Sequence, residues 1–335
     1  YNFVQQHLQA IEEPNYTAAG LLSHRDAINA LHFPDSMDHA ATARKRLALD
    51  EFVSLQCLLQ RRRNNLQTKS KGLPCAGDGS FSEPFLEEIG FQLTAAQRTV
   101  SMEINADLNG KYPMRRLLQG DVGSGKTIVS FLTIANVLES NYQCALMSPT
   151  EILCLQHFHL AQKIFEKIDI RIEFLTGKTS YSKRKEILKD LAEGKINFLI
   201  GSHSLFQKKI KFKNLGYVII DEQHKFGVKQ RSDLAKKGGK NCDLLLMSAT
   251  PIPRTMMMSL YGDMDISKIN EKPSNRKAIL TLSKPEKKIN ELWPFIKKNI
   301  KQQNQIFWVC PLINESQFLD YSSAKKRFDL ISKYF

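Results

Sequence analysis

The pattern of apolar and polar positions divides the chain into a helical beginning and an alternating middle. Within residues 21–63 apolar side chains recur three and four positions apart, as Leu49, Phe52 and Val53 do, which places them on one stripe of a helix. Residues 64–83 show no such period and contain several glycines and a proline, which is typical of a loop. We therefore expect a helical unit over residues 1–83 that ends in this loop.

Beyond residue 85 short apolar runs alternate with helical patterns. We expect strands at residues 116–119, 144–148, 170–174, 196–200, 217–220 and 244–247, and helices at residues 128–138, 152–165 and 182–192. Strands that alternate with helices form a parallel sheet covered on both faces, and a fully apolar run suits a central strand of such a sheet. The expected fold class is α/β, preceded by the helical unit.

The end of the chain has the pattern of a second α/β domain. Residues 286–301 are amphipathic with a helical period, and residues 306–310 have the composition of a buried strand. Because too few residues follow to complete a sheet, we expect one full α/β domain at residues 84–282 and only the start of another at residues 283–335.

Composition and charge narrow the class of protein. The 335 residues are 42% hydrophobic and 24% charged, which suits a packed globular protein and excludes disordered, collagen-like and coiled-coil chains. The 48 Lys and Arg residues exceed the 34 Asp and Glu residues, and the net charge of +14 favours a polyanionic partner.

Cysteine spacing and hydropathy indicate a compartment. The six cysteines form no Cys-x-x-Cys pair, so neither a zinc site nor a secreted disulfide framework is expected, and a reducing, cytoplasmic setting follows. No apolar run approaches the ~20 residues that a membrane span requires, and no signal peptide is evident. The chain starts at Tyr1 rather than at Met, and we expect it to be a fragment.

Residues 120–127 match the phosphate-binding pattern G-x-x-x-x-G-K-[ST] between an expected strand and an expected helix. Glycines allow the tight turn that aims successive backbone N–H groups at a phosphate, where the helix N-terminus adds positive charge. Lys126 then reaches the β- and γ-phosphates, and the Thr127 hydroxyl ligates Mg²⁺. The expected ATP-binding residues are Gly120, Asp121, Val122, Gly123, Ser124, Gly125, Lys126 and Thr127.

Asp221 and Glu222 follow the apolar run 217–220, so their side chains are expected at the carboxyl edge of the sheet, where α/β proteins bind ligands. We assign Asp221 to Mg²⁺, and we assign Glu222 to orienting and deprotonating the attacking water. Taken alone, such a pair is most often a helix cap or a solvated turn. Together with the phosphate loop it predicts an enzyme that hydrolyses nucleoside triphosphates.

Gln97 stands three residues after Thr94, and this spacing has two interpretations. The pair forms a capping box at a helix start on one interpretation. On the other, the amide of Gln97 reads adenine, because its C=O and NH₂ match the N6 and N7 edge of the base. The sequence does not decide between them.

Five segments in order resemble the motor of superfamily 2 helicases. They are residues 120–127, Ser-Pro-Thr-Glu at 148–151, Gly-Ser-His at 201–203, Asp-Glu-Gln-His at 221–224 and Ser-Ala-Thr-Pro at 248–251. The longer segments 221–231, 248–255 and 307–313 resemble the RecG family of bacterial ATP-dependent DNA helicases. The resemblance is strong from about residue 91 to residue 313 and weaker before it.

The resemblance implies a P-loop NTPase of the RecA-like fold: a first RecA-like ATP-binding domain at residues 84–282, the start of a second at 283–335, and a helical linker at 1–83 that follows an oligonucleotide-binding wedge domain. It implies a monomeric bacterial helicase that uses ATP and Mg²⁺ to move on double-stranded DNA. The expected substrates are stalled replication forks and Holliday junctions, in recombination and repair. Single-stranded-DNA-binding protein is a further partner that the resemblance suggests.

Carried over by motif, the resemblance gives roles to individual residues. It places Gln97 at adenine; Lys126, Asp221, Glu222 and His224 in the hydrolytic centre; Ser248 and Thr250 in the coupling of hydrolysis to movement; and Pro149, Thr150, Gly201 and His203 along the DNA. Family members also carry arginines on the second motor lobe that complete the ATP site. The chain ends before them, so we expect it to bind ATP and Mg²⁺, to hydrolyse ATP poorly and not to unwind DNA.

Two alternatives remain open at this stage. One is the related translocase that couples transcription to repair, which shares the segment 226–231. The other is a truncated module that binds ATP and DNA with little catalysis.

Overall fold

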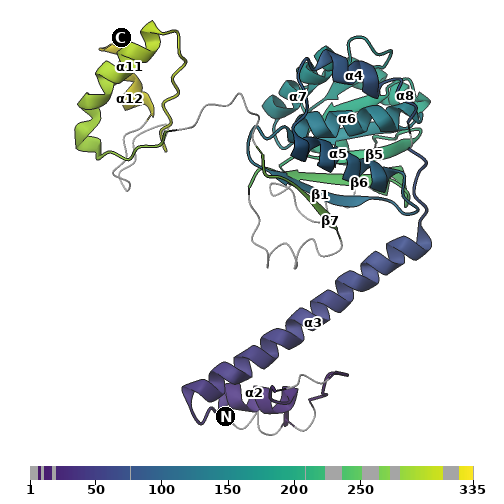
Figure 1. Ribbon diagram of the computed structural model, residues 1–335, viewed down its shortest axis with the longest axis vertical. Helices are drawn as coiled ribbons and strands as arrows, with labels where there is room; N and C mark the ends of the chain where they lie inside the picture. Colours follow the sequence, from purple (N-terminus) through teal and green to yellow (C-terminus); the bar gives the residue numbers. More distant parts are fainter. Residues whose placement is uncertain are drawn as a thin grey trace. The chain divides into compact units, whose positions relative to one another are not determined.

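The computed structural model of the protein describes residues 7–8, 11–16, 20–75, 77–207, 209–222, 236–250, 264–271, 280–311 and 324–334. The chain forms two compact units, Tyr1–Asn275 and Arg276–Phe335. The first unit contains the helical beginning and the sheet, and the second contains the last helices (Figure 1). Within these ranges no helix combines the length and the apolar composition needed to cross a membrane.

Two helices form the beginning of the first unit, α2 (His24–His32) and α3 (Met37–Lys69). Each starts after a serine, Ser23 or Ser36, whose hydroxyl oxygen accepts a hydrogen bond from a backbone N–H three residues later. The two helices pack against each other through buried alanines. The helical pattern predicted for this part of the chain is therefore present as two helices.

The loop predicted at residues 64–83 starts later than expected, because α3 continues to Lys69. The first residues of the predicted loop contain no Pro or Gly to stop a helix, and tertiary contacts favour its extension. Arg63 makes an ion pair of 3.0 Å with Asp265, which belongs to the sheet. The helix ends where the backbone N–H of Ser70 bonds to Leu66 O.

The sheet contains seven described strands, all of whose pairings are parallel, in the order β3-β4-β2-β5-β6-β1-β7. Their bounds are β1 Arg115–Gly120, β2 Gln143–Met147, β3 Ile172–Leu175, β4 Phe198–Gly201, β5 Leu215–Ile220, β6 Asp243–Ser248 and β7 Asp265–Ile269. The six predicted strands are confirmed within two residues at each end. The sequence analysis missed β7, an edge strand that pairs only with β1 among the described strands.

Helices cover both faces of this sheet, as predicted. They are α4 (Ser82–Glu88), α5 (Ala95–Leu108), α6 (Lys126–Glu139), α7 (Glu151–Ile164) and α8 (Tyr181–Glu193). Residues of α4 to α7 pack with one set of strand side chains, and residues of α8 pack with the alternate set on the opposite face. Figure 1 shows α5 and α6 side by side over the sheet. The three predicted helices correspond to α6, α7 and α8.

Glu139, the last residue of α6, binds the backbone of the segment that leads from α3 into α4. Its Oε2 accepts from the N–H groups of Asp78 and Gly79 at 3.0 and 3.2 Å. Its Oε1 accepts from Phe81 and Ser82 at 2.8 and 2.7 Å. One carboxylate thus satisfies four backbone donors, two of them at the start of α4.

The second unit contains the 3₁₀ helix η5 (Glu286–Glu291) and the helices α11 (Leu292–Lys301) and α12 (Ala324–Ser332). The single helix predicted at residues 286–301 is therefore divided into two. Pro294 supplies the reason, since it has no N–H to bond and its ring would clash with the carbonyl of Asn290 in a continuous helix.

The strand predicted at residues 306–310 is wrong for this structure. Residues 306–310 form no strand, and the side chains of Phe307 and Val309 are 84% and 88% exposed. An apolar run becomes a strand only when a neighbouring strand pairs with its backbone, and the described residues of this unit include none. Trp308 instead stacks on Trp293 of α11, with ring centroids 5.7 Å apart.

Candidate active site at the phosphate loop

The loop between β1 and α6 has the backbone that the phosphate-binding pattern requires. Gly123 and Gly125 have φ angles of 75° and 91°, in the left-handed region that favours glycine. A Cβ on Gly125 would lie 2.2 Å from Gln97 Nε2, so no larger residue fits there without a shift. Gly125 is also the N-cap of α6, which directs the positive end of that helix at the loop.

Lys126 is folded back onto this loop. Its Nζ donates to Gly120 O at 2.6 Å and to Asp121 O at 3.0 Å, and the residue is buried. Burial lowers the pKa of Lys126, and the carboxylates of Asp221, Glu222 and Asp121 act in the opposite direction. The ammonium group therefore lies in the field of the acidic pair that was predicted to share its site.

Asp221 and Glu222 directly follow β5, at the carboxyl edge of the sheet. The backbone N–H of Asp221 donates to Met147 O at 2.8 Å, which continues the pairing with β2 by one residue. Asp221 is buried, and its Oδ1 accepts from the backbone N–H of Glu222 at 3.0 Å. Glu222 has a φ of 48°, an uncommon conformation for a residue with a side chain and one that is frequent at functional sites.

The sequence analysis missed His157 of α7, which also belongs to this site. Its Nε2 lies 2.9 Å from Asp221 Oδ2, and its side chain is only 10% exposed. The sequence gives no signal for this contact, because His157 is simply one residue within the helix predicted at residues 152–165. A lone histidine on an apolar helix face is usually structural, and only the fold shows which carboxylate it meets.

Gln97 forms the capping box with Thr94 at the start of α5. Gln97 Oε1 accepts from Thr94 N at 2.9 Å, while Thr94 Oγ1 accepts from Gln97 N at 3.2 Å. Gln97 Nε2 donates to Ser124 O in the phosphate loop at 2.8 Å. The amide thus connects α5 to the phosphate loop, and its role at adenine stays a prediction.

The predicted coupling residues lie at the end of β6, next to the strand that carries the phosphate loop. Ser248 pairs in register with Gln119 of β1, and Gln119 Nε2 donates to Thr250 O at 3.3 Å. Ser248 Oγ and Thr250 Oγ1 lie 3.2 Å apart.

The four residues predicted to contact DNA lie together on another part of the same edge. Pro149 and Thr150 follow β2, Gly201 ends β4 and His203 starts the 3₁₀ helix η2 (His203–Phe206). The two strands are neighbours, and Ser148 N donates to Gly201 O at 3.2 Å. A Cβ on Gly201 would lie 2.4 Å from Leu175 O, which explains a glycine there.

Strand order therefore separates two regions of the carboxyl edge. The phosphate loop follows β1, the predicted DNA residues follow β2 and β4, and β5 with Asp221 lies between β2 and β6. The remaining predicted residue, His224, lies outside the described residues.

The donor set at the phosphate loop fits a magnesium nucleotide. Thr127 and Asp221 offer hydroxyl and carboxylate oxygens, which Mg²⁺ prefers. The described residues contain no group of three or more His, Cys, Asp or Glu side chains that could hold a metal by themselves. A bound Mg²⁺ would thus take its other ligands from phosphate and water, as is usual for this ion. The buried Ser124 Oγ has no hydrogen-bond partner among the described residues, so this loop retains an unused polar group.

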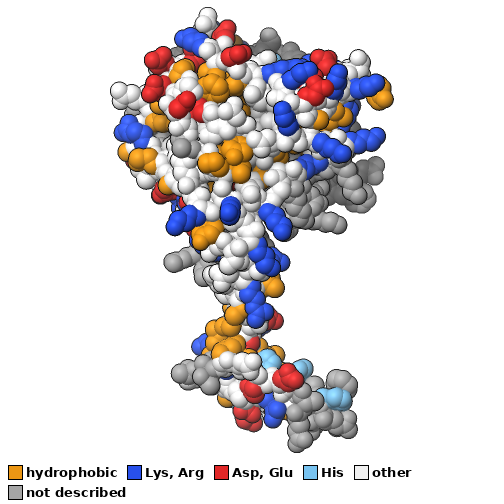
Figure 2. Space-filling view, turned by 90° about the vertical axis from the view of Figure 1, so that its right-hand side faces the viewer, with side chains coloured by type: hydrophobic (Ala, Val, Ile, Leu, Met, Phe, Trp, Pro, Cys, Tyr) orange, Lys and Arg blue, Asp and Glu red, His pale blue; other side chains and the backbone are white. Residues whose placement is uncertain are grey.

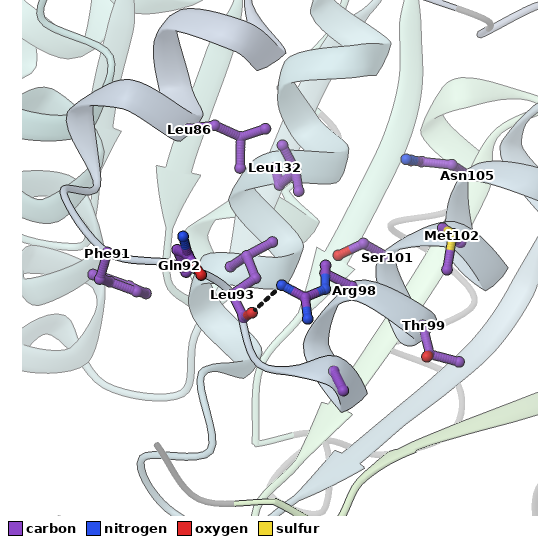
Figure 3. Close-up of a pocket in the computed structure, with 11 residues that line it drawn as sticks. Leu86, Phe91, Gln92, Leu93, Arg98, Thr99, Ser101, Met102, Asn105 and Leu132 are labelled. Atoms are coloured by element: carbon purple, nitrogen blue, oxygen red, sulfur yellow. Dashed lines mark hydrogen bonds between the residues drawn. The ribbon is translucent and has the colours of Figure 1, made fainter. Parts of the chain in front are cut away.

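One pocket borders the phosphate loop, and another lies on α5. One of about 280 Å³ lies beside Gly120 and Asp121, and Lys268, Asn270 and Glu271 after β7 also line it. The other, of about 620 Å³, lies between α4, α5 and α6 and is lined largely by apolar side chains such as those of Leu86, Phe91 and Met102 (Figure 3). Arg98 in this second pocket donates to Leu93 O at 2.8 Å. The first pocket therefore adjoins the phosphate loop, and the second offers mainly apolar packing.

Comparisons with known proteins agree with this geometry. The family model described as DEAD/DEAH box helicase matches residues 94–259. The chain is 43% identical over 313 residues to the ATP-dependent DNA helicase RecG of Thermotoga maritima, covering 93% of the chain and 40% of the relative. It is 40% identical to the RecG of Bacillus subtilis, covering 92% of the chain and 45% of the relative.

A solved structure titled "Structure of RecG bound to three-way DNA junction" superimposes with a TM-score of 0.79 at 36% identity. This match covers 99% of the chain and 44% of that protein. The chain thus spans less than half the length of these relatives. Sequence identity over nearly the whole chain, the matching fold and the helicase domain agree, and the chain belongs to the RecG family of ATP-dependent DNA helicases.

Proposed function

We propose that the chain is the ATP-hydrolysing motor part of a helicase that moves on double-stranded DNA and remodels branched DNA. The observation that supports this most is that Asp221 and Glu222 act electrostatically on Lys126 beside the phosphate loop. The chain also has RecG relatives. The solved relative is bound to a three-way junction, which favours forks and Holliday junctions as substrates of this chain.

In this proposal the chain's own groups perform four tasks at the nucleotide. The loop amides from Gly120 to Thr127 and the ammonium of Lys126 bind the phosphates, with Lys126 exchanging loop carbonyls for phosphate oxygens. Thr127 and Asp221 would hold Mg²⁺, which would neutralise charge on the phosphates. Glu222, with His224, orients the attacking water and accepts its proton as the bond to the γ-phosphorus forms and the bond to the β-phosphate oxygen breaks. Gln97 contacts adenine.

DNA is proposed to lie along Pro149, Thr150, Gly201 and His203. Contacts of this kind are made to the phosphate backbone, and they suit a chain with a net charge of +14. On the face that Figure 2 shows, Lys and Arg side chains lie along α3 and over the sheet domain. We expect DNA binding to weaken as salt is raised and to depend little on base sequence.

The proposed organisation is a helical linker at residues 1–83, a first RecA-like domain at 84–282 and the start of a second at 283–335. We further propose that the protein acts as a monomer and that single-stranded-DNA-binding protein is a partner. Ser248 and Thr250, beside β1, couple hydrolysis to movement of the motor.

Two variants of the intact gene product test the proposal. Lys126→Ala is expected to abolish binding of a fluorescent ATP analogue, because it removes the cation that holds the phosphates. Glu222→Gln is expected to retain this binding and to lower the rate of ATP hydrolysis on forked DNA roughly 10²- to 10⁴-fold, because the amide cannot accept the proton. Lys189→Ala, a substitution on the outer face of α8, is the control. Unchanged binding in the first variant, or unchanged hydrolysis in the second, would contradict the proposal.

A further inference from the structure

His157 reaches the hydrolytic centre from a helix that lies outside the nucleotide-binding motifs. Within α7 it belongs to a buried stripe with Cys154, Ala161 and Ile164, at the spacing of one helix face. Its ring packs edge-on against Phe131 of α6, with the ring centroids 6.3 Å apart. Apolar packing therefore fixes the orientation of the imidazole before any ligand binds.

The hydrogen bond between His157 and Asp221 has a defined direction. A carboxylate only accepts hydrogen bonds, so the Nε2 of His157 carries the proton and donates it to Oδ2 at 2.9 Å. The other oxygen of Asp221 accepts from the backbone N–H of Glu222 at 3.0 Å. Each carboxylate oxygen thus has one donor, and the two donors together set the plane of the group that is proposed to hold Mg²⁺.

The same helix carries a proposed DNA contact at its N-terminus. Thr150 is the N-cap of α7, and its hydroxyl oxygen accepts from Leu153 N at 3.2 Å. His157 follows it by seven residues, which is about two turns and ~10 Å along the axis on the same face. A regular helix is stiff over this distance, so a shift of Thr150 displaces the donor to Asp221.

We propose that His157 is a positioning residue that holds the carboxylate of Asp221 from α7 and thereby couples DNA contact at Thr150 to the binding of the magnesium nucleotide. The inference rests on the proposed function, because it takes Asp221 as a magnesium carboxylate and Thr150 as a DNA contact. Hydrogen-bond partners of this kind keep a metal-binding carboxylate in its binding orientation. A coupling of this kind is reciprocal, so the magnesium nucleotide also changes the affinity for DNA.

Three variants separate this role from simple packing. His157→Phe keeps the shape of a flat ring and removes the donor. His157→Gln restores a donor, because its amide nitrogen is as many bonds from Cα as Nε2 of histidine. His159→Gln changes an exposed histidine on the opposite side of the same helix and is the matched control.

The measurement is binding of a fluorescent ATP analogue to the protein, titrated with Mg²⁺ and repeated with duplex DNA. We expect His157→Phe to need about 10- to 100-fold more Mg²⁺ for half-maximal binding than the unchanged protein. Binding in EDTA is expected to stay the same. His157→Gln is expected to recover most of the magnesium affinity, and His159→Gln to match the unchanged protein. The factor by which DNA changes nucleotide affinity is expected to fall toward one in His157→Phe.

Several results would overturn the inference. A folded His157→Phe variant could need the same Mg²⁺ concentration as the unchanged protein and show the same effect of DNA on nucleotide affinity. That result would show a purely structural role for His157, in which the substitution lowers only the thermal unfolding midpoint. Equal impairment of the Gln and Phe variants would exclude the donor as the cause. If the Phe variant does not fold, His157→Asn, whose amide is too short to reach Oδ2, takes its place. Failure of the unchanged protein to bind nucleotide at any Mg²⁺ concentration would instead reject the proposed function.

Discussion

Asp221 and Asp243 lie on or next to neighbouring parallel strands of one sheet, but at opposite ends of these strands. Asp221 follows β5 at the carboxyl edge, where each of its oxygens accepts a hydrogen bond. Asp243 begins β6 at the amino edge, where Oδ1 accepts from Met114 N at 2.6 Å. Its Oδ2 is buried without a hydrogen-bond partner among the described residues. Both residues are buried, with 9% and 1% exposure, so burial alone does not distinguish them.

The two aspartates differ in the groups that surround their carboxylates. Burial raises the pKa of Asp243 to about 7, and the hydrogen bond from Met114 and the charge of Arg115 only partly oppose this. Asp221 instead has the Nε2 of His157 at 2.9 Å from its Oδ2, and its carboxylate acts electrostatically on the nearby Lys126. Both oxygens of Asp221 therefore have hydrogen-bond partners, whereas burial disfavours the charge of Asp243. Paired substitutions at the two positions test this distinction.

The largest effect is expected from Asp221→Asn. Loss of the charge should lower ATP hydrolysis by the intact gene product on the order of 10²-fold, because a neutral amide holds Mg²⁺ poorly. Asp243→Asn, the same chemical change at the other edge, should leave the rate unchanged at pH 8 and below the unfolding temperature. Steady-state hydrolysis measures both, and an equal loss in the two variants would remove the functional distinction between the edges.

An intermediate effect is expected on the pH dependence of stability. The folded pKa of Asp243, about 7, exceeds the ordinary value of 3.8, so the folded state holds this proton more tightly than the unfolded state. The stability that this group contributes is complete below pH 3.8 and is lost as pH rises to about 7, by up to about 1.4 kcal/mol per pH unit. Asp243→Asn should flatten this part of the profile.

Urea unfolding at intervals from low to neutral pH measures this slope. The control is Asp35→Asn, which replaces an aspartate whose side chain is 91% exposed and should keep the slope of the unchanged protein. If the free energy of unfolding changed with pH equally in the unchanged protein and in Asp243→Asn, ionisation of Asp243 would not destabilise the folded protein.

The smallest effect is expected at Asp265, a third aspartate, at the start of β7 on the amino edge. Its ion pair with Arg63 of α3 is 3.0 Å long, with the two side chains 46% and 36% exposed. Water screens such a pair, so Arg63→Ala should lower the free energy of unfolding by about 0–1 kcal/mol. Arg62→Ala, one residue earlier on the exposed side of α3, is the matched control for denaturant unfolding. A loss of several kcal/mol would show that this contact is better shielded than its exposure indicates.

The features that sequence predicted well depend on local pattern. The phosphate loop needs only its glycines, Lys126 and a strand and helix on either side, and all of these lie within a short segment. The acidic pair was placed at the carboxyl edge because β5 is apolar throughout and must end where polar residues begin. Such inferences use the period of a strand or helix and do not require knowledge of distant contacts.

The features that were missed depend on contacts between distant segments. His157 is separated from Asp221 by 64 residues, and nothing in the helix around it shows that a carboxylate faces it. The extension of α3 to Lys69 is accompanied by the contact of Arg63 with a strand 202 residues later. The strand predicted at residues 306–310 was wrong for the converse reason, because an apolar run needs a pairing neighbour that the pattern does not supply.

The carboxylate of Glu139 places a narrow constraint on what substitutions the chain can accept. Four amides converge on one side chain, two from the turn at residues 78–79 and two from the start of α4. Aspartate, one methylene shorter, could not serve both pairs, and glutamine would turn an NH₂ group toward donors. Position 139 is thus expected to admit little variation, although it lies at the opposite end of α6 from Lys126 and takes no part in chemistry.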